Sequence, residues 1–225
     1  MAESGRKRSA LVPGVLVDAA GPKTYVAHRG GVGAFAPLLY VLAQQHGLAQ
    51  AQEIVILGDG AAWIWNLVAE HFPSAVQIVD LWLARQPVWQ VANAVFGPTT
   101  AQGAAWAEVQ CQLLEEGNIE ALVEAIALLP PILPPPTGSR SLPEQAIDYF
   151  ITHAARMRYP VFRAQGMHIG SGIAEAACKT VVSTRMKRSG MRWTPAGLDA
   201  LLALRTARLN GTFDPFWKQR FHLVA

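Results

Sequence analysis

The stretch that decides the fold begins with EIVIL (53–57) and ends with AVQIVD (75–80). Both runs are short, apolar and rich in β-branched residues, which is typical of buried strands. Between them, Ala61–Phe72 follows a helical pattern. A strand, a helix and a strand within about thirty residues predict a βαβ unit with a parallel pair. Asp59 follows the first strand and Asp80 ends the second, at the edge where open α/β sheets build their sites.

Asp59 lies between two glycines in the sequence LGDGAAWIW (57–65). Glycine allows a tight turn and leaves the carboxylate exposed at the strand end. The turn is not a phosphate-binding loop, because the second glycine, the lysine and the Ser/Thr of that motif are missing. Two interpretations stay open: Asp59 caps the following helix, or it binds a metal ion.

The composition favours a globular chain with a sizeable core. Of 225 residues, 51% are hydrophobic and 16% are charged, which argues against general disorder. No apolar run approaches the roughly 18 residues of a membrane helix, so no membrane partner is expected. Cys111 and Cys178 are far apart and lack metal-ligand spacing. We therefore expect a reducing, cytoplasmic location, although Arg6–Arg8 before an apolar run loosely imitates a signal peptide.

The proline-rich sequence PPILPPPTGS (130–139) is the clearest linker. Residues 11–29 are expected to be extended, and Tyr159–Phe162 to form a short extended piece. Helices are expected over 35–46, 81–96, 101–116, 119–129, 142–157, 172–188 and 195–210. We therefore predict an α/β fold in three segments: a core (1–82), a helical segment with the linker (83–140) and a helical C-terminal segment (141–225).

Glu175 lies opposite the apolar side of the helix predicted over 172–188. Apolar residues recur there at i, i+3, i+4, i+7, i+8 and i+11: Ile173, Ala176, Ala177, Thr180, Val181 and Thr184. At about 100° per residue, Glu175 falls on the other side, with Lys179 one turn later. Glu175 is either half of a solvated Glu–Lys pair or a carboxylate that faces a cleft beside the sheet.

The sequence KTVVSTRMKRSGMRW (179–193) is basic and contains no acidic residue. Its candidate DNA-binding residues are Lys179, Arg185, Lys187, Arg188, Arg192 and Trp193. Residues 176–225 contain nine Lys/Arg and two Asp, a net charge of +7, whereas the whole chain carries +3. Basic residues beside a tryptophan suit phosphate contact plus base stacking. The alternative is a solvated surface on which Trp193 anchors the next helix.

Other residues that often carry chemistry form no recognisable motif. The histidines are scattered without metal-ligand spacing: His46, His71, His153 and His168. Trp63, Trp65 and Trp82 are expected to pack in the core or under a lid.

Two long blocks resemble a known family. VILGDGAAWIWNLVAEHFPSAVQIVDLW (55–82) and HAARMRYPVFRAQGMHIGSGIAEAACKTVVSTRMKRSGMRWTPAGLDALLALR (153–205) look like the catalytic region of insertion-sequence transposases of the ISKra group. The resemblance runs from about Thr24 to Arg220. The group belongs to the DDE class, so the resemblance implies a partial RNase H-like fold with a large helical insertion over about 83–140.

The resemblance also implies roles for two acidic residues. Asp59 matches the family's second metal-binding carboxylate, and Glu175 matches the third. In that family, three carboxylates hold two divalent cations, Mg²⁺ or Mn²⁺, which serve phosphodiester displacement. The implied partners are DNA at the transposon ends and the target, with a homo-oligomer or a full-length transposase as further partners.

Two departures from the family pattern limit the implied activity. The first carboxylate belongs upstream of the TYVA block (24–27), and Asp18 is the only acidic residue of the extended N-terminal segment. Leu83 and Pro87 stand where the family has two histidines, and Pro87 is expected to interrupt the helical backbone. We therefore expect a truncated DDE transposase fragment that is inactive alone. The alternatives are a non-catalytic DNA-binding or transposase-binding remnant, and a metal-dependent nuclease that uses Asp18, Asp59 and Glu175.

Overall fold

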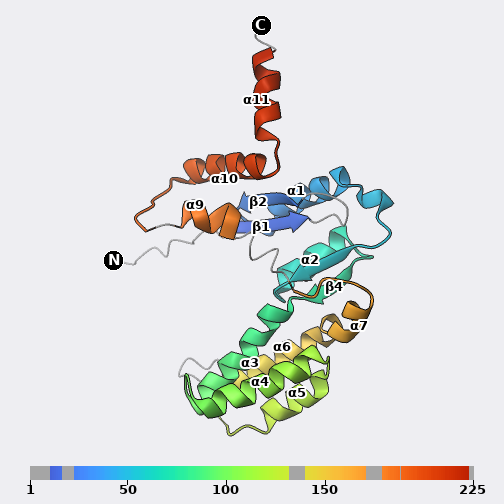
Figure 1. Cartoon of the computed structure of the whole chain (residues 1–225), viewed down its shortest axis with the longest axis vertical. Helices are drawn as coiled ribbons and strands as arrows, with labels where there is room; N and C mark the ends of the chain where they lie inside the picture. Colours follow the sequence, from blue (N-terminus) through green and yellow to red (C-terminus); the bar gives the residue numbers. More distant parts are fainter. Residues whose placement is uncertain (1–10, 17–22, 132–139, 171–178, 188, 223–225) are drawn as a thin grey trace. The chain divides into compact units, whose positions relative to one another are not determined.

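The computed structural model describes residues 11–16, 23–131, 140–170, 179–187 and 189–222 (Figure 1). The chain divides into two compact units. One comprises Glu53–Ser171, and the other combines Met1–Gln52 with Gly172–Ala225. The described residues are mostly helical and contain two small two-stranded sheets, so the fold is mixed α/β. The three sequence segments, 1–82, 83–140 and 141–225, stay a prediction.

The predicted βαβ unit is confirmed in the unit Glu53–Ser171. β3 (Val55–Gly58) and β4 (Val76–Val79) pair in parallel, and α2 (Ala62–His71) connects them. Ile78 and Val79, which point to opposite faces of the sheet, are both fully buried, so this part of β4 is covered on both faces.

Four helices of this unit lie side by side (Figure 1). They are α3 (Leu81–Phe96), α4 (Ala101–Glu115), α5 (Ile119–Ala127) and α6 (Leu142–His153). Each begins at a residue whose side chain accepts a hydrogen bond from a first-turn backbone N–H: Asp80, Thr100, Asn118 and Ser141. Their apolar faces meet in a core that includes Val88, Leu114, Leu122 and Phe150. These helices agree with the sequence expectations, but α3 continues through Pro87 instead of breaking there.

The extended piece predicted over Tyr159–Phe162 was wrong. A short 3₁₀ turn (Ala154–Arg156) leads into α7 (Tyr159–Ala164). Tyr, Val and Phe favour strands, but Pro160 in the first turn has the fixed φ that suits a helix start. The helix buries Tyr159 and Phe162 on one side, and the Tyr159 hydroxyl donates to the Val79 carbonyl at 3.1 Å.

The other unit is built around an antiparallel pair of strands, which confirms the prediction of extended structure for residues 11–16 and 24–29; residues 17–22 lie outside the described residues. β1 (Leu11–Leu16) pairs with β2 (Thr24–Arg29), followed by α1 (Val32–Gln45) and a 3₁₀ turn (Leu48–Gln50). α10 (Pro195–Leu209) lies against β2 and begins at the predicted cap, Thr194 (Figure 1). α11 (Phe213–His222) was not predicted, because its apolar residues follow no clear stripe.

Asn210, which follows the last residue of α10, forms hydrogen bonds with the backbone of β2. Its side-chain Oδ1 accepts the Tyr25 N–H at 2.8 Å, and its Nδ2 donates to the Tyr25 carbonyl at 2.9 Å. The amide therefore satisfies both backbone groups of Tyr25, as a neighbouring strand would. Nearer the start of α10, Arg29 and Asp199 form a two-pronged ion pair with both contacts at 2.7 Å, which holds the pKa of Asp199 below its usual range.

A helix was predicted over 172–188, and the structure describes residues 179–187 of it. This part does not form the regular α-helix that was expected. Lys179–Ser183 forms a π-helical turn, followed by α9 (Thr184–Met186). A π turn adds one residue per turn and shifts which positions face the core. Val181, Val182 and Met186 are buried against Leu202, whereas Thr184, expected on the apolar side, is exposed.

His153 is a buried polar residue of the unit Glu53–Ser171, with 6% of its surface exposed. Its Nδ1 lies 3.3 Å from an Arg156 guanidinium nitrogen, and it makes a hydrogen bond to the backbone of Gly60. Burial first, and the Arg156 charge second, lower the pKa of His153, so the neutral ring is favoured in the folded state.

Where the structure describes the chain, no helix combines the length and the apolar character that a membrane span requires.

Asn210→Ala should destabilise the chain by about 1–3 kcal/mol, because two partly buried backbone groups of Tyr25 lose their partners. Asn210→Asp should fall between Ala and the wild type, since it keeps the acceptor and loses the donor. Urea unfolding measures both values. Equal stability of all three proteins would contradict this account.

Stability should fall as the pH drops below about 6.5. The unfolded chain binds a proton at His153 more readily than the folded chain does, so protonation favours unfolding. Melting temperatures measured between pH 5 and 8 test this. His153→Gln should flatten the pH dependence, whereas the matched change His168→Gln, at an exposed position, should leave it unchanged.

Candidate functional site

The pairing of β3 with β4 places two aspartates side by side. Gly58 pairs with Val79, and the Asp80 N–H donates to the Gly58 carbonyl at 2.8 Å. Asp59 and Asp80 therefore follow the last strand pair at the same carboxyl edge of the sheet. This edge is where open α/β sheets place their functional groups.

The two aspartates have different environments and different partners. Asp80 is 2% exposed and begins α3, where its Oδ1 accepts the N–H groups of Trp82 and Leu83 at 2.8 and 3.3 Å. Asp59 is exposed, and its Oδ1 accepts the Ala61 N–H at 2.9 Å. Asp80 is thus committed to a structural cap, whereas Asp59 presents a carboxylate to solvent next to the start of α2.

The Asp59–Gly60 turn is held from one side by α6. Gly60 has φ +93°, and a Cβ atom at this position would lie 2.6 Å from the Tyr149 ring, so only glycine fits. The Tyr149 hydroxyl donates to the Asp59 carbonyl at 3.3 Å, and His153 bonds to the Gly60 backbone. Burial, then the charges of Asp59 and Asp80, raise the pKa of Tyr149, which keeps its hydroxyl protonated as a donor.

An open groove of about 450 Å³ lies beside Asp59. α3 and α6 complete its wall with Leu83, Gln86, Pro87, Gln90 and Tyr149. Leu83 and Pro87, the positions at which the sequence departs from the transposase pattern, therefore lie at the same groove as Asp59. The structure brings together parts of the motif that are more than twenty residues apart.

The described residues do not contain a complete set of metal ligands. Among them, no group of three or more His, Cys, Asp or Glu side chains is placed to hold an ion. Asp59 offers an oxygen ligand of the kind that Mg²⁺ prefers, in a position that leaves room for water. Glu175 and Asp18 lie outside the described residues.

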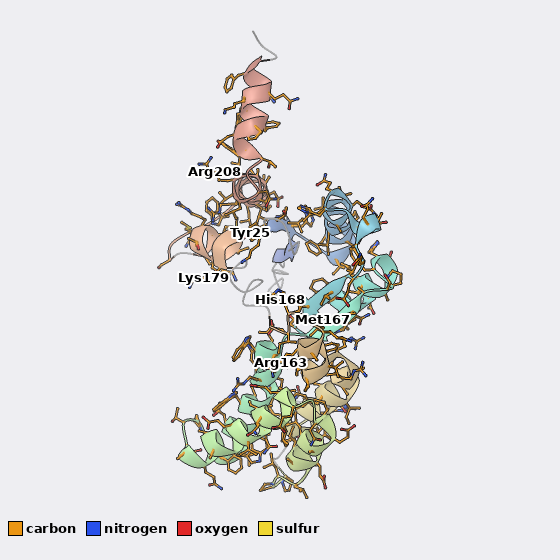
Figure 2. The ribbon with its side chains drawn as sticks, turned by 45° about the vertical axis from the view of Figure 1, so that its right-hand side comes forward. Tyr25, Arg163, Met167, His168, Lys179 and Arg208 are labelled. Atoms are coloured by element: carbon orange, nitrogen blue, oxygen red, sulfur yellow. The ribbon has the colours of Figure 1, made fainter. Side chains whose placement is uncertain are left out.

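The basic segment 179–193 presents its cations to solvent. Lys179 at its start is exposed (Figure 2), as are Arg185, Lys187 and Arg192. In the part of the chain that the structure describes, none of these four cations pairs with a carboxylate. Trp193 is 42% exposed, so it does not lie buried beneath the next helix. Arg188 lies outside the described residues.

Two residues that hold the Asp59 turn had no recognisable signal in the sequence. Tyr149 and His153 are about ninety residues from the turn that they hold, and no local pattern connects them with it. Trp63 and Trp82 were expected in the core or under a lid, but they are 36% and 59% exposed. Trp65, by contrast, is buried as expected.

Comparisons with known proteins give one short similarity. No protein-family model matches the chain, and no solved structure matches it. A UPF0236 protein in the vanSb 3′ region of Streptococcus gallolyticus is 27% identical over 74 residues. The aligned stretch covers 33% of this chain and 16% of that protein, so the chain is similar to a small part of it.

Proposed function

We propose that this chain is part of the catalytic region of a transposase-like protein of the DDE class, with a partial RNase H-like core. The observation that carries the proposal is the exposed carboxylate of Asp59, at the carboxyl end of β3 and beside an open groove. The short similarity to a UPF0236 protein is compatible with it. The reaction would be cleavage and transfer of DNA phosphodiester bonds.

In this proposal Asp59 and Glu175 hold Mg²⁺ or Mn²⁺. A bound divalent cation would supply Lewis-acid activation of a water or a 3′-hydroxyl and charge stabilisation at the leaving oxygen. Tyr149 and His153 keep the Asp59–Gly60 turn in place by bonds to its backbone, and Asp59 Oδ1 also accepts the Ala61 N–H, so the exposed carboxylate would be positioned to act as a ligand. Asp80 fixes the start of α3, which contributes Leu83, Gln86, Pro87 and Gln90 to the wall of the groove.

The basic segment 179–193 would bind the DNA backbone. Exposed cations without carboxylate partners release counterions when they contact phosphates, which gives tight, sequence-tolerant binding at low salt. The exposed Trp193 beside Arg192 adds a surface for stacking.

The chain by itself is proposed to bind DNA without cleaving it. Asp59 supplies one carboxylate among the described residues, and a two-metal reaction needs several oxygen ligands around a pair of cations. A second candidate function follows from the same observations: a non-catalytic protein that binds DNA or a full-length transposase. Lys179, Arg185, Lys187 and Arg192, which are exposed and have no carboxylate partner among the described residues, favour it independently of Asp59.

Mn²⁺ should bind weakly at Asp59 and broaden the amide NMR signals of residues 58–61. Asp59→Asn should remove the broadening, because an amide is a much poorer ligand for a hard cation than a carboxylate. Asp214→Asn, at another exposed aspartate, should preserve the broadening.

With supercoiled DNA and Mg²⁺ or Mn²⁺, nicking by the wild-type chain should not exceed nicking by the double variant Asp59→Asn/Glu175→Gln. Nicking by the wild type alone would show an active nuclease and make Asp18 the residue to test.

DNA affinity should fall steeply with salt. In a chelator, Arg185→Ala/Lys187→Ala should weaken duplex binding and reduce the slope of log K against log salt by about 1.8, as expected for two lost phosphate contacts. The charge-matched variant Lys218→Ala/Arg220→Ala should change the slope less. Fluorescence anisotropy at several salt concentrations measures all three proteins. Identical slopes would mean that segment 179–193 is only a solvated surface.

A further inference from the structure

α3 presents an unusual face to solvent. Its outward residues recur at i, i+3, i+4, i+7, i+8 and i+11, the pattern of one side of a helix: Trp82, Arg85, Gln86, Trp89, Gln90 and Asn93. These six residues line a second open groove, of about 600 Å³. The opposite side, which includes Ala84, Val88 and Val91, is buried. The exposed face therefore consists of two indoles, three amides and one cation.

The aromatic part of this face is held in place from below. The Arg85 guanidinium lies 5.2 Å from the centre of the Trp82 ring and forms an ion pair with Glu115 of α4 at 3.2 Å. The buried Cys111 thiol has hydrogen-bond contacts with both Arg85 and Trp89. The indoles thus lose little conformational freedom when a ligand stacks on them.

The side chains on the exposed face of α3 favour one kind of ligand over others. A protein helix would need aliphatic contacts, but Gln86, Gln90 and Asn93 are exposed amides. A duplex backbone would need free cations, but Arg85 is already paired with Glu115. Unpaired bases offer flat faces for indoles and polar edges for amides, whereas the bases of a duplex are stacked on one another.

The position of the face links it to the candidate site. Gln86 and Gln90 line both this groove and the groove beside Asp59. A strand stacked along α3 would therefore continue past the Asp59 carboxylate.

We propose that this face of α3 binds an unpaired DNA strand by base stacking, with Trp82 as its main contact, and directs the strand to Asp59. The inference rests on the proposed function, since it names the form of DNA that the same site receives. Trp82 acts in binding and in strand placement, without a part in the chemical step.

The test is binding of the full chain to labelled oligothymidylate of about ten nucleotides, measured by fluorescence anisotropy in a chelator. Trp82→Ala should weaken binding at least about fivefold, the lower end of the effect of one lost base–aromatic stack. Its salt slope should stay unchanged, because no phosphate contact is lost. Trp82→Phe should keep most of the affinity. Trp217→Ala, at a 37% exposed tryptophan on α11, is the matched control and should bind as the wild type does. Thermal melting establishes that each variant is folded.

The inference would be overturned if Trp82→Ala bound the single strand as tightly as the wild type does. Two other results would also overturn it. If Trp82→Ala loses affinity for duplex DNA by the same factor, the face binds a duplex. If sedimentation shows a dimer that Trp82→Ala abolishes, the face binds a second copy of the chain. If duplex binding still depends on Arg185 and Lys187 in that case, the proposed DNA function stands without the stacking surface. Absence of any DNA binding by the wild type would overturn both. If single-strand binding depends on Trp82 but Mn²⁺ does not bind at Asp59 in the NMR experiment, the stacking surface is supported and the proposed metal chemistry is contradicted.

Discussion

The parallel pairing of β3 with β4 positions the candidate residues of the unit Glu53–Ser171. Because Gly58 faces Val79 in the register, Asp59 and Asp80 leave the sheet at one edge, and α2 and α3 start from that edge. A shift of one residue would turn every side chain of the strand to the other face. The start of α3 in turn sets which helix face borders the Asp59 groove. The groove and the exposed face of α3 thus both follow from one strand register.

Asp59 and Asp80 lie at the same edge of the sheet but differ in burial and in hydrogen-bond partners, because their surroundings differ. The buried Asp80 carboxylate is stabilised by the backbone N–H groups of Trp82 and Leu83, which offset the cost of its burial. Asp59 remains exposed to water; its Oδ1 accepts the Ala61 N–H, and Tyr149 and His153 fix the same turn through its backbone. The contacts of Tyr149 and His153 to the backbone do not cover the carboxylate, and an accessible carboxylate is a requirement for any role in binding a cation.

Local signals predicted much of the fold correctly. The strands around 53–57 and 75–80, the helix over 81–96 and the cap at Thr194 all agree with the structure, since each depends on residues near one another in sequence. The candidate site was predicted less completely. Asp59 was recognised from its flanking glycines, whereas Tyr149 and His153 reach it from a helix ninety residues away. Glu175 and the RNase H-like arrangement stay predictions.

The sequence by itself determined the βαβ unit, the acidic residues at its strand ends and the concentration of positive charge after residue 176, because apolar periodicity, turn residues and charge are local properties. Only the tertiary structure decided which aspartate is buried, which tryptophan is exposed and which residues of the segment 179–187 face the core. Those outcomes depend on long-range packing: on α6 against the Asp59 turn, on α4 beneath α3, and on a π turn that shifts Val181 and Val182 together into contact with α10. Burial is a property of the assembled fold, and no single stretch of chain specifies it.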